Sequence, residues 1–176
     1  MPQDIISQVH TSLIRNKKTL SVAESCTGGL LSSLLTELSG SSKYFTLGIV
    51  TYSNKTKEKI LGIPLSILAS KGAASEDVAK LMAQKVRRLA KTDFGIGITG
   101  IAGPTGCAEA HTGASFSAGC GTLRKPVGTV FIAVAAKNKT ICKKFRFKGS
   151  RSNIRTKSVL KALQIFLYFN KAKEGK

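Results

Sequence analysis

Apolar residues recur every three to four positions in several stretches of the chain, which is the spacing that places them on one face of a helix. Ser75 is a good N-cap residue for one of these stretches, and Gly40 and Gly72 are stop signals for two others. The helices predicted in this way lie at residues 5–15, 30–38, 54–61, 64–71, 75–89 and 154–168.

Short β-branched and apolar runs alternate with these helices and predict strands. Lys137, Asn138 and Lys139 form a turn between the last two runs, so those two strands are expected to pair as an antiparallel hairpin. Strands that alternate with helices predict an α/β fold, a three-layer α/β/α sandwich with a mixed, mostly parallel sheet of about five to six strands. The strands are predicted at residues 20–24, 45–52, 94–99, 127–136 and 140–147.

Length and composition are those of one compact domain covering residues 1–176, because 42% of the 176 residues are hydrophobic. A Gly-, Ala-, Ser- and Thr-rich stretch at about 105–124 predicts an extended loop. The longest uncharged stretch, 94–108, is too short and too polar to span a bilayer, so no membrane is expected as a partner. No basic segment leads into an apolar run at the N-terminus, and a cytoplasmic location is expected.

The cysteines and histidines do not indicate a metal site or a disulfide framework. The four cysteines include no C-x-x-C pair, and His10 and His111 lie in no metal-ligand spacing. We therefore expect no metal and no cofactor. The cysteines are Cys26, Cys107, Cys120 and Cys142.

The chain is strongly basic, with 28 Lys and Arg against 9 Asp and Glu and a formal charge of +19. Residues 143–176 hold eleven of the basic residues and one acid, Glu174. Such a charge is typical of nucleic-acid binders, but a solvated face on the last helix explains it equally. Because no RNA-module or helix-turn-helix pattern accompanies the charge, nucleic acid is expected as a partner only through unspecific charge attraction.

Residues 95–100 read Gly-Ile-Gly-Ile-Thr-Gly, a literal G-x-G-x-x-G. In a dinucleotide-binding motif these glycines open a helix whose N-terminus meets a pyrophosphate. Here they lie inside a predicted strand that a long loop follows. The motif is therefore interpreted as a strand, and no P-loop pattern is present in the chain.

Two glycine-rich segments follow predicted strands and are candidates for binding a ligand. Residues 25–29 precede a helix, where free backbone N–H groups favour an anion such as phosphate, although a tight turn explains the glycines equally. Residues 99–104 leave the end of another strand, on the side where open α/β sheets bind ligands. The candidate substrate-binding residues are Ser25, Thr27, Gly28, Gly29, Thr99, Gly100, Ala102 and Gly103, together with Arg151 on the last helix.

Neither histidine is placed for a Ser-His-Asp arrangement, so a different base is needed. Lys57 is a candidate, since an N-cap at Asn54 would place it in the first helical turn, where the helix dipole and neighbouring lysines lower its pKa. Ser42 and Tyr52 flank the preceding strand, and the three could meet at one sheet edge. Each also has a structural explanation, as a turn serine, a strand-end tyrosine and a solvated lysine.

The order and spacing of seven motifs resemble the CinA C-terminal domain family, the nicotinamide-nucleotide amidohydrolases, from about residue 5 to 170. The motifs are Ala23-Glu24-Ser25-Cys26-Thr27-Gly28-Gly29, Gly40-Ser41-Ser42-Lys43-Tyr44-Phe45, Val50-Thr51-Tyr52-Ser53-Asn54 with Lys57, Leu61-Gly62-Ile63, Gly72-Ala73-Ala74-Ser75-Glu76, Thr99-Gly100-Ile101-Ala102-Gly103-Pro104 and Lys125-Pro126-Val127-Gly128-Thr129-Val130.

This resemblance implies hydrolysis of the carboxamide of nicotinamide mononucleotide to nicotinate mononucleotide and ammonia, a step of pyridine nucleotide recycling, without a metal. It also implies a catalytic set of Ser42, Tyr52 and Lys57, and a homo-oligomer, a dimer, is expected. The chain departs from the family pattern around the expected pocket, with Lys55 and Arg124 in place of acids and Ser150 in place of Asp. The alternative is a non-catalytic relative that binds nucleotides or nucleic acid.

Overall fold

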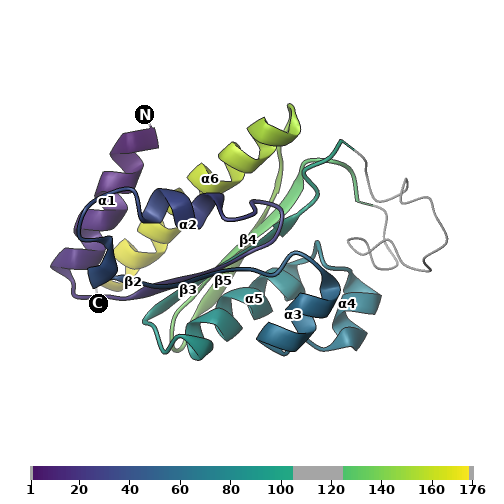
Figure 1. The fold of residues 1–176 in the computed structure, drawn as a ribbon, viewed down its shortest axis with the longest axis horizontal. Helices are drawn as coiled ribbons and strands as arrows, with labels where there is room; N and C mark the ends of the chain where they lie inside the picture. The colour runs from purple at the N-terminus through teal and green to yellow at the C-terminus, as the bar shows by residue number, and fades with distance from the viewer. Residues whose placement is uncertain (1, 105–124, 175–176) are drawn as a thin grey trace.

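A computed structural model describes residues 2–104 and 125–174, with side chains from residue 4 to residue 170 within these ranges. The fold is a five-stranded sheet between two layers of helices (Figure 1). The expected three-layer α/β architecture is therefore confirmed. The extended loop expected at about 105–124, with Cys107, His111 and Cys120, lies outside the described residues.

The sheet has the strand order β2-β1-β3-β4-β5 and is mixed. β1 pairs in parallel with both β2 and β3, whereas β4 pairs antiparallel with β3 and with β5. The last two strands form the expected hairpin, closed by a hydrogen bond from the Ala136 amide to the Lys139 carbonyl. The strands are β1 (Leu20–Glu24), β2 (Phe45–Val50), β3 (Phe94–Gly100), β4 (Thr129–Ala135) and β5 (Thr140–Arg146).

The helices divide between the two faces of the sheet (Figure 1). α1 (Pro2–Arg15), α2 (Leu30–Leu35) and α6 (Arg151–Glu174) cover one face, and their apolar residues share a core cluster with Leu20, Val22, Ile96 and Ile98. The other face is covered by α3 (Asn54–Leu61), α4 (Leu65–Lys71) and α5 (Glu76–Leu89). α2 ends at Leu35, three residues before the predicted end, where the backbone of Thr36 leaves the helical conformation.

The G-x-G-x-x-G segment is β3, as interpreted from the sequence, and its glycines serve packing between the sheet and α5. A Cβ added to Gly95 would collide with the carbonyl oxygen of Ala83, and one added to Gly97 would collide with that of Ala79. Glycine at these two positions therefore lets the α5 backbone lie directly against the strand. The segment has no part in binding a nucleotide through a helix N-terminus.

The topology indicates where a ligand would bind. The chain leaves β1 for β2 on one side and then returns past β1 to β3 on the other, so the strand order reverses at β1. Open α/β sheets bind ligands outside the carboxyl ends of the strands at such a reversal. The segments that leave β1, β2 and β3 begin with Ser25, Thr51 and Ile101, and all three lie at this edge.

Candidate active site

A buried lysine and a serine are in hydrogen-bond contact at the carboxyl ends of β1 and β2. Lys57 has no exposed surface, and its Nζ lies 3.2 Å from the Oγ of Ser25. The same Nζ donates to the carbonyl oxygens of Thr51 at 2.7 Å and Tyr52 at 3.2 Å. A nucleophile and a base within hydrogen-bond reach form the arrangement that activates a hydroxyl group.

Local sequence explains how the two side chains are positioned. The backbone N–H of Ser25 donates to the carbonyl of Ile98 at 3.0 Å, which continues the pairing of β1 with β3 beyond the strand end. Lys57 lies one turn into α3, whose start is fixed by reciprocal hydrogen bonds between Ser53 and Thr56, a capping box. The N-cap is therefore Ser53, whereas the sequence had suggested Asn54.

Burial lowers the pKa of Lys57 from 10.5 to about 8, because the charged ammonium loses its hydration. The lowered pKa expected from the sequence is present, but its cause is burial rather than the helix dipole and the neighbouring lysines. Cys26, next to Ser25, is also buried, and burial raises the pKa of its thiol to about 12. The thiol therefore remains protonated at neutral pH and is a weak nucleophile.

Ser42 does not lie at this site. It belongs to the short 3-10 helix η1 (Ser41–Lys43), which precedes β2, whereas Tyr52 and Lys57 follow the strand. The six residues of β2 span roughly 20 Å at the usual rise per residue. The expectation that Ser42, Tyr52 and Lys57 meet at one sheet edge is therefore wrong within the chain, and Ser25 is the serine that Lys57 contacts.

Tyr52 has an exposed side chain that extends along the same edge. Its hydroxyl accepts a hydrogen bond from Nη2 of Arg151 at 2.8 Å, and Nη1 of Arg151 donates to the carbonyl of Gly103 at 2.7 Å. Arg151 is the first residue of α6 and connects the segments after β2 and β3. This guanidinium carries five N–H groups, so it can bind an anion while it keeps both contacts.

The free N–H groups at the start of α2 are not available to a phosphate. The buried carboxylate of Glu24 accepts hydrogen bonds from the amides of Gly29, Leu31 and Ser32 and from the hydroxyl of Ser32. The tight-turn interpretation of Gly28 and Gly29 is thus favoured, with φ values of +58° and +93° that side chains rarely adopt. The sequence did not reveal this role of Glu24.

Most of the segment after β3, which was expected to bind a ligand, packs against the rest of the fold instead. The hydroxyl of Thr99 donates to the carbonyl of Ala73 at 2.7 Å, and Ala102 belongs to the core cluster. A Cβ on Gly100 would lie 2.6 Å from the carbonyl oxygen of Thr129, so the glycine is needed for contact with β4. Of the four residues predicted here, Gly103 is joined to the site, through Arg151.

Two buried threonine hydroxyls at the site lack a hydrogen-bond partner among the described residues. They belong to Thr27, after β1, and Thr51, after β2, and both side chains are fully buried. Buried polar atoms are normally satisfied, so these hydroxyls are candidates for contact with a polar ligand. Arg155 lies close by and donates from Nε and Nη2 to the carbonyl of Thr27. Thr51 has no sequence signal beyond its place at the end of a strand.

Within residues 2–104 and 125–174 no three His, Cys, Asp or Glu side chains cluster closely enough to hold a metal ion. No helix in the same ranges is long and apolar enough to cross a membrane.

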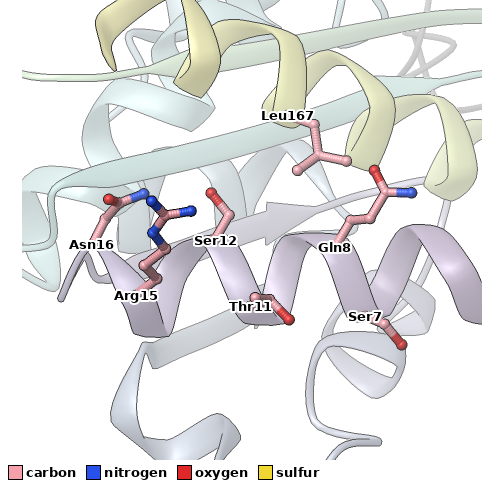
Figure 2. Close-up of a pocket in the computed structure, with 7 residues that line it drawn as sticks. All are labelled: Ser7, Gln8, Thr11, Ser12, Arg15, Asn16 and Leu167. Carbon is pink, nitrogen blue, oxygen red and sulfur yellow. The ribbon is translucent and has the colours of Figure 1, made fainter.

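A separate hollow of about 570 Å³ lies between α1 and α6 and contains none of the site residues (Figure 2). Its lining includes Gln8, Ser12, Arg15 and Leu167.

Known proteins resemble this chain over most of its length. The profile of the CinA C-terminal domain matches residues 2–169. The chain belongs to this family. A competence-damage inducible protein of Thermoanaerobacter pseudethanolicus is 50% identical over 153 residues, and a CinA-like protein of Syntrophus aciditrophicus is 47% identical over 154 residues. Each alignment covers 87% of this chain, with 34% and 33% of the relative, so this CinA domain spans about a third of these proteins.

Solved structures of CinA-superfamily proteins have the same fold. The competence/damage inducible protein CihA of Agrobacterium tumefaciens has a TM-score of 0.85 at 32% identity, covering 96% of this chain and 95% of that protein. A CinA superfamily protein of Escherichia coli has a TM-score of 0.84 at 30% identity, covering 95% and 89%. The similarity to both CinA proteins extends over nearly the whole domain.

Proposed function

We propose that this CinA domain is an amidohydrolase that converts nicotinamide mononucleotide to nicotinate mononucleotide and ammonia. The observation that carries the proposal is the contact between Ser25 and the buried amine of Lys57. The substrate comes from the family resemblance of the sequence motifs. The relatives' names, competence-damage inducible and CinA-like, do not specify a reaction.

In the proposed reaction, the neutral amine of Lys57 takes the proton of the Ser25 hydroxyl while Oγ attacks the carboxamide carbon. The tetrahedral intermediate then collapses, the C–N bond breaks and the proton passes to the departing nitrogen, which leaves as ammonia. Water hydrolyses the acyl ester on Ser25, and the carboxylate product leaves. Every proton transfer uses a group already in the site, so no cofactor is required.

The pKa of Lys57 suits a general base. With a pKa of about 8, about one molecule in ten has a neutral amine at pH 7, compared with fewer than one in a thousand for an ordinary lysine. Tyr52 is the proposed proton relay to the leaving group, because its backbone contacts Lys57 and its hydroxyl is held by Arg151.

Arg151 and Arg155 are proposed to bind the phosphate of the nucleotide. They lie four positions apart at the start of α6 and therefore on one side of it. They donate hydrogen bonds to Tyr52, Gly103 and Thr27, all at the edge where Ser25 lies. A guanidinium is the side chain best suited to a phosphate, because its N–H groups match the oxygens in pairs.

The direct test incubates the purified chain with nicotinamide mononucleotide and measures nicotinate mononucleotide and ammonia together. The proposal expects both products in equal amounts, and it expects Lys57→Met to abolish them. Lys59→Met is the matched control, since Lys59 is on the same helix and exposed. If the wild-type chain forms neither product, the proposed function is overturned.

A further inference from the structure

A narrow groove runs along the edge of the sheet between β5 and α6, away from the site around Ser25. It is a hollow of about 200 Å³ whose floor includes the buried side chain of Ile165. The residues that line this β5–α6 groove are Lys143, Phe145, Lys161, Gln164, Ile165 and Tyr168. It is smaller than the pockets that usually enclose a small molecule, and its lining includes the exposed side chains of Lys143, Gln164 and Tyr168.

Side chains from α6 reach the residues of β5 and the segment after it at two points. On α6, Lys157, Lys161, Gln164 and Tyr168 follow one another at intervals of three and four positions and so form a stripe on one side of the helix. At one end Lys157 donates to the carbonyl of Lys148, just after β5. Farther along, Lys161 lies over the ring of Phe145, 5.9 Å from its centroid. The contact of Lys161 with Phe145 lies within the groove, and Lys157 continues the same stripe of α6 beyond it.

The surroundings of the groove are uniformly basic. Between residues 125 and 170 there are eleven Lys and Arg and no Asp or Glu. The two ion pairs recorded among the described residues, Lys18 with Asp93 and Lys80 with Glu76, involve other parts of the surface. The positive charge of Lys143 and Lys161 is therefore not neutralised by a neighbouring acid in the described structure, and it favours a polyanion.

An exposed aromatic ring and an amide distinguish this groove from a plain cationic face. The side chain of Tyr168 is 71% exposed, more than that of any other large hydrophobic residue in the part of the chain that the structure describes. Gln164 beside it is exposed and can both donate and accept hydrogen bonds. Rings on which bases stack, next to lysines that follow the backbone, are the features with which proteins bind single-stranded nucleic acid.

A membrane surface fits these observations less well. Adsorption to a bilayer needs a broad apolar face on an amphipathic helix, and the large apolar residues of α6, such as Leu163, Phe166 and Phe169, are buried in the core instead. In the groove itself Tyr168 is exposed, whereas Phe145 is half-buried and Ile165 is buried, so the apolar surface offered to a bilayer is small. An acidic peptide would use the lysines but would have no need for the exposed ring.

We propose that the β5–α6 groove is a binding surface for single-stranded nucleic acid, with Tyr168 as the stacking platform and Lys143 and Lys161 as contacts to the phosphates. This inference is independent of the proposed amidohydrolase activity. It also goes beyond unspecific charge attraction, because it assigns the binding to one ring and one groove.

The test is a fluorescence-anisotropy titration of the full chain with a labelled oligothymidylate of about 20 nucleotides, long enough to exceed the usual site size. We expect Tyr168→Ala to raise Kd about tenfold or more at fixed salt, as loss of a stacked base does elsewhere. Tyr168→Phe keeps the ring and should bind as the wild type does. If Tyr168→Ala binds as tightly as Tyr168→Phe, the proposal is overturned.

Salt dependence tests the lysines separately. The double variant Lys143→Gln/Lys161→Gln should reduce the slope of log K against log salt by about 1.4, from roughly 0.7 for each phosphate contact in a single strand. Arg88→Gln/Lys91→Gln removes the same charge from exposed positions at the end of α5 and should leave the slope unchanged. Equal slopes for both double variants would place the binding elsewhere.

Competition identifies the class of partner. An unlabelled polyglutamate peptide or phosphatidylserine vesicles should displace the oligothymidylate poorly at equal charge concentration. If either competes as well as unlabelled oligothymidylate, the groove is an acidic-peptide or lipid surface and the assignment to nucleic acid is overturned. Ammonia release by Tyr168→Ala should equal that of the wild type, which separates this outcome from a failure of the proposed activity.

Discussion

The Nζ of Lys57 lies 3.2 Å from the Oγ of Ser25, although 32 positions separate the two residues in the sequence. Parallel pairing of β1 and β2 brings them together, because each residue follows the carboxyl end of its strand. Full burial of the amine has two consequences that can be measured. One concerns the pH dependence of catalysis, and the other concerns the stability of the fold.

The rate of amide hydrolysis should rise with pH and level off above the pKa of Lys57. In the proposed reaction the neutral amine acts as the base, and its pKa is about 8, so kcat/KM should increase about tenfold per pH unit below that value. Lys57→Arg keeps a positive charge that cannot be removed and should be inactive throughout. A wild-type profile that is flat from pH 6 to 9 would contradict the assignment of Lys57 as the base.

Burial of Lys57 should also cost stability at neutral pH. The pKa is about 8 in the folded chain and 10.5 for an ordinary lysine, so the unfolded chain holds an extra proton between these values. The free energy of unfolding therefore rises with pH across this interval, by about 3 kcal/mol in total. Lys57→Met lacks this effect. Burial raises the pKa of the Cys26 thiol, which lowers the free energy of unfolding at high pH, but both proteins contain Cys26.

The measurement is denaturant unfolding of the wild type and Lys57→Met at pH 7 and pH 10. The difference between the two proteins should shift by about 2 to 3 kcal/mol in favour of the wild type at the higher pH. Comparing two proteins cancels the change in overall charge, which affects both alike. Parallel pH curves would mean that the amine of Lys57 is hydrated in the folded chain.

Replacement of Glu24 tests the cap of α2. Its carboxylate accepts four hydrogen bonds from Gly29, Leu31 and Ser32, so Glu24→Gln would turn an amide N–H₂ towards buried donors. We expect the free energy of unfolding to fall by about 2 to 4 kcal/mol. Glu37→Gln, at an exposed position after α2, should change it by less than about 0.5 kcal/mol. Equal midpoints of denaturant unfolding for Glu24→Gln and Glu37→Gln would contradict the role of Glu24 as the cap of α2.

Arg151 is expected to act mainly on the phosphate of the substrate. Arg151→Ala should raise KM for nicotinamide mononucleotide about tenfold or more and lower kcat less, because a remote phosphate contact contributes equally to ground and transition states. KM for nicotinamide riboside, which lacks the phosphate, should hardly change. An equal rise in KM for both substrates would mean that Arg151 does not bind the phosphate and acts only through its contacts with Tyr52 and Gly103.

The sequence predicted the fold well because periodicity reports local burial. β1 (Leu20–Glu24) has the predicted bounds, Ser75 is the N-cap of α5, and the hairpin turns at the expected residues. The ends of elements were less predictable, since they depend on tertiary contacts. β2, for example, ends at Val50 instead of Tyr52. The carbonyls of Thr51 and Tyr52 accept hydrogen bonds from Lys57 instead of continuing the strand.

The site was predictable only in part. Lys57 and the serine after β1 were both identified, but their pairing was not, because a contact between two loops depends on which strands are neighbours. Glu24 was missed for a similar reason, since a carboxylate at the end of a buried strand gives no sign of whether it faces a ligand or a helix. The structure assigns it to the start of α2.

Ser25, and not Ser42, is the proposed nucleophile. Ser25→Ala and Ser42→Ala should be compared with the wild type in ammonia release from nicotinamide mononucleotide at pH 8, close to the pKa of Lys57. Ser25→Ala should lose about three orders of magnitude or more in kcat, and Ser42→Ala should stay within about a factor of three of the wild type. The reverse order, with Ser42→Ala inactive and Ser25→Ala active, would contradict this assignment.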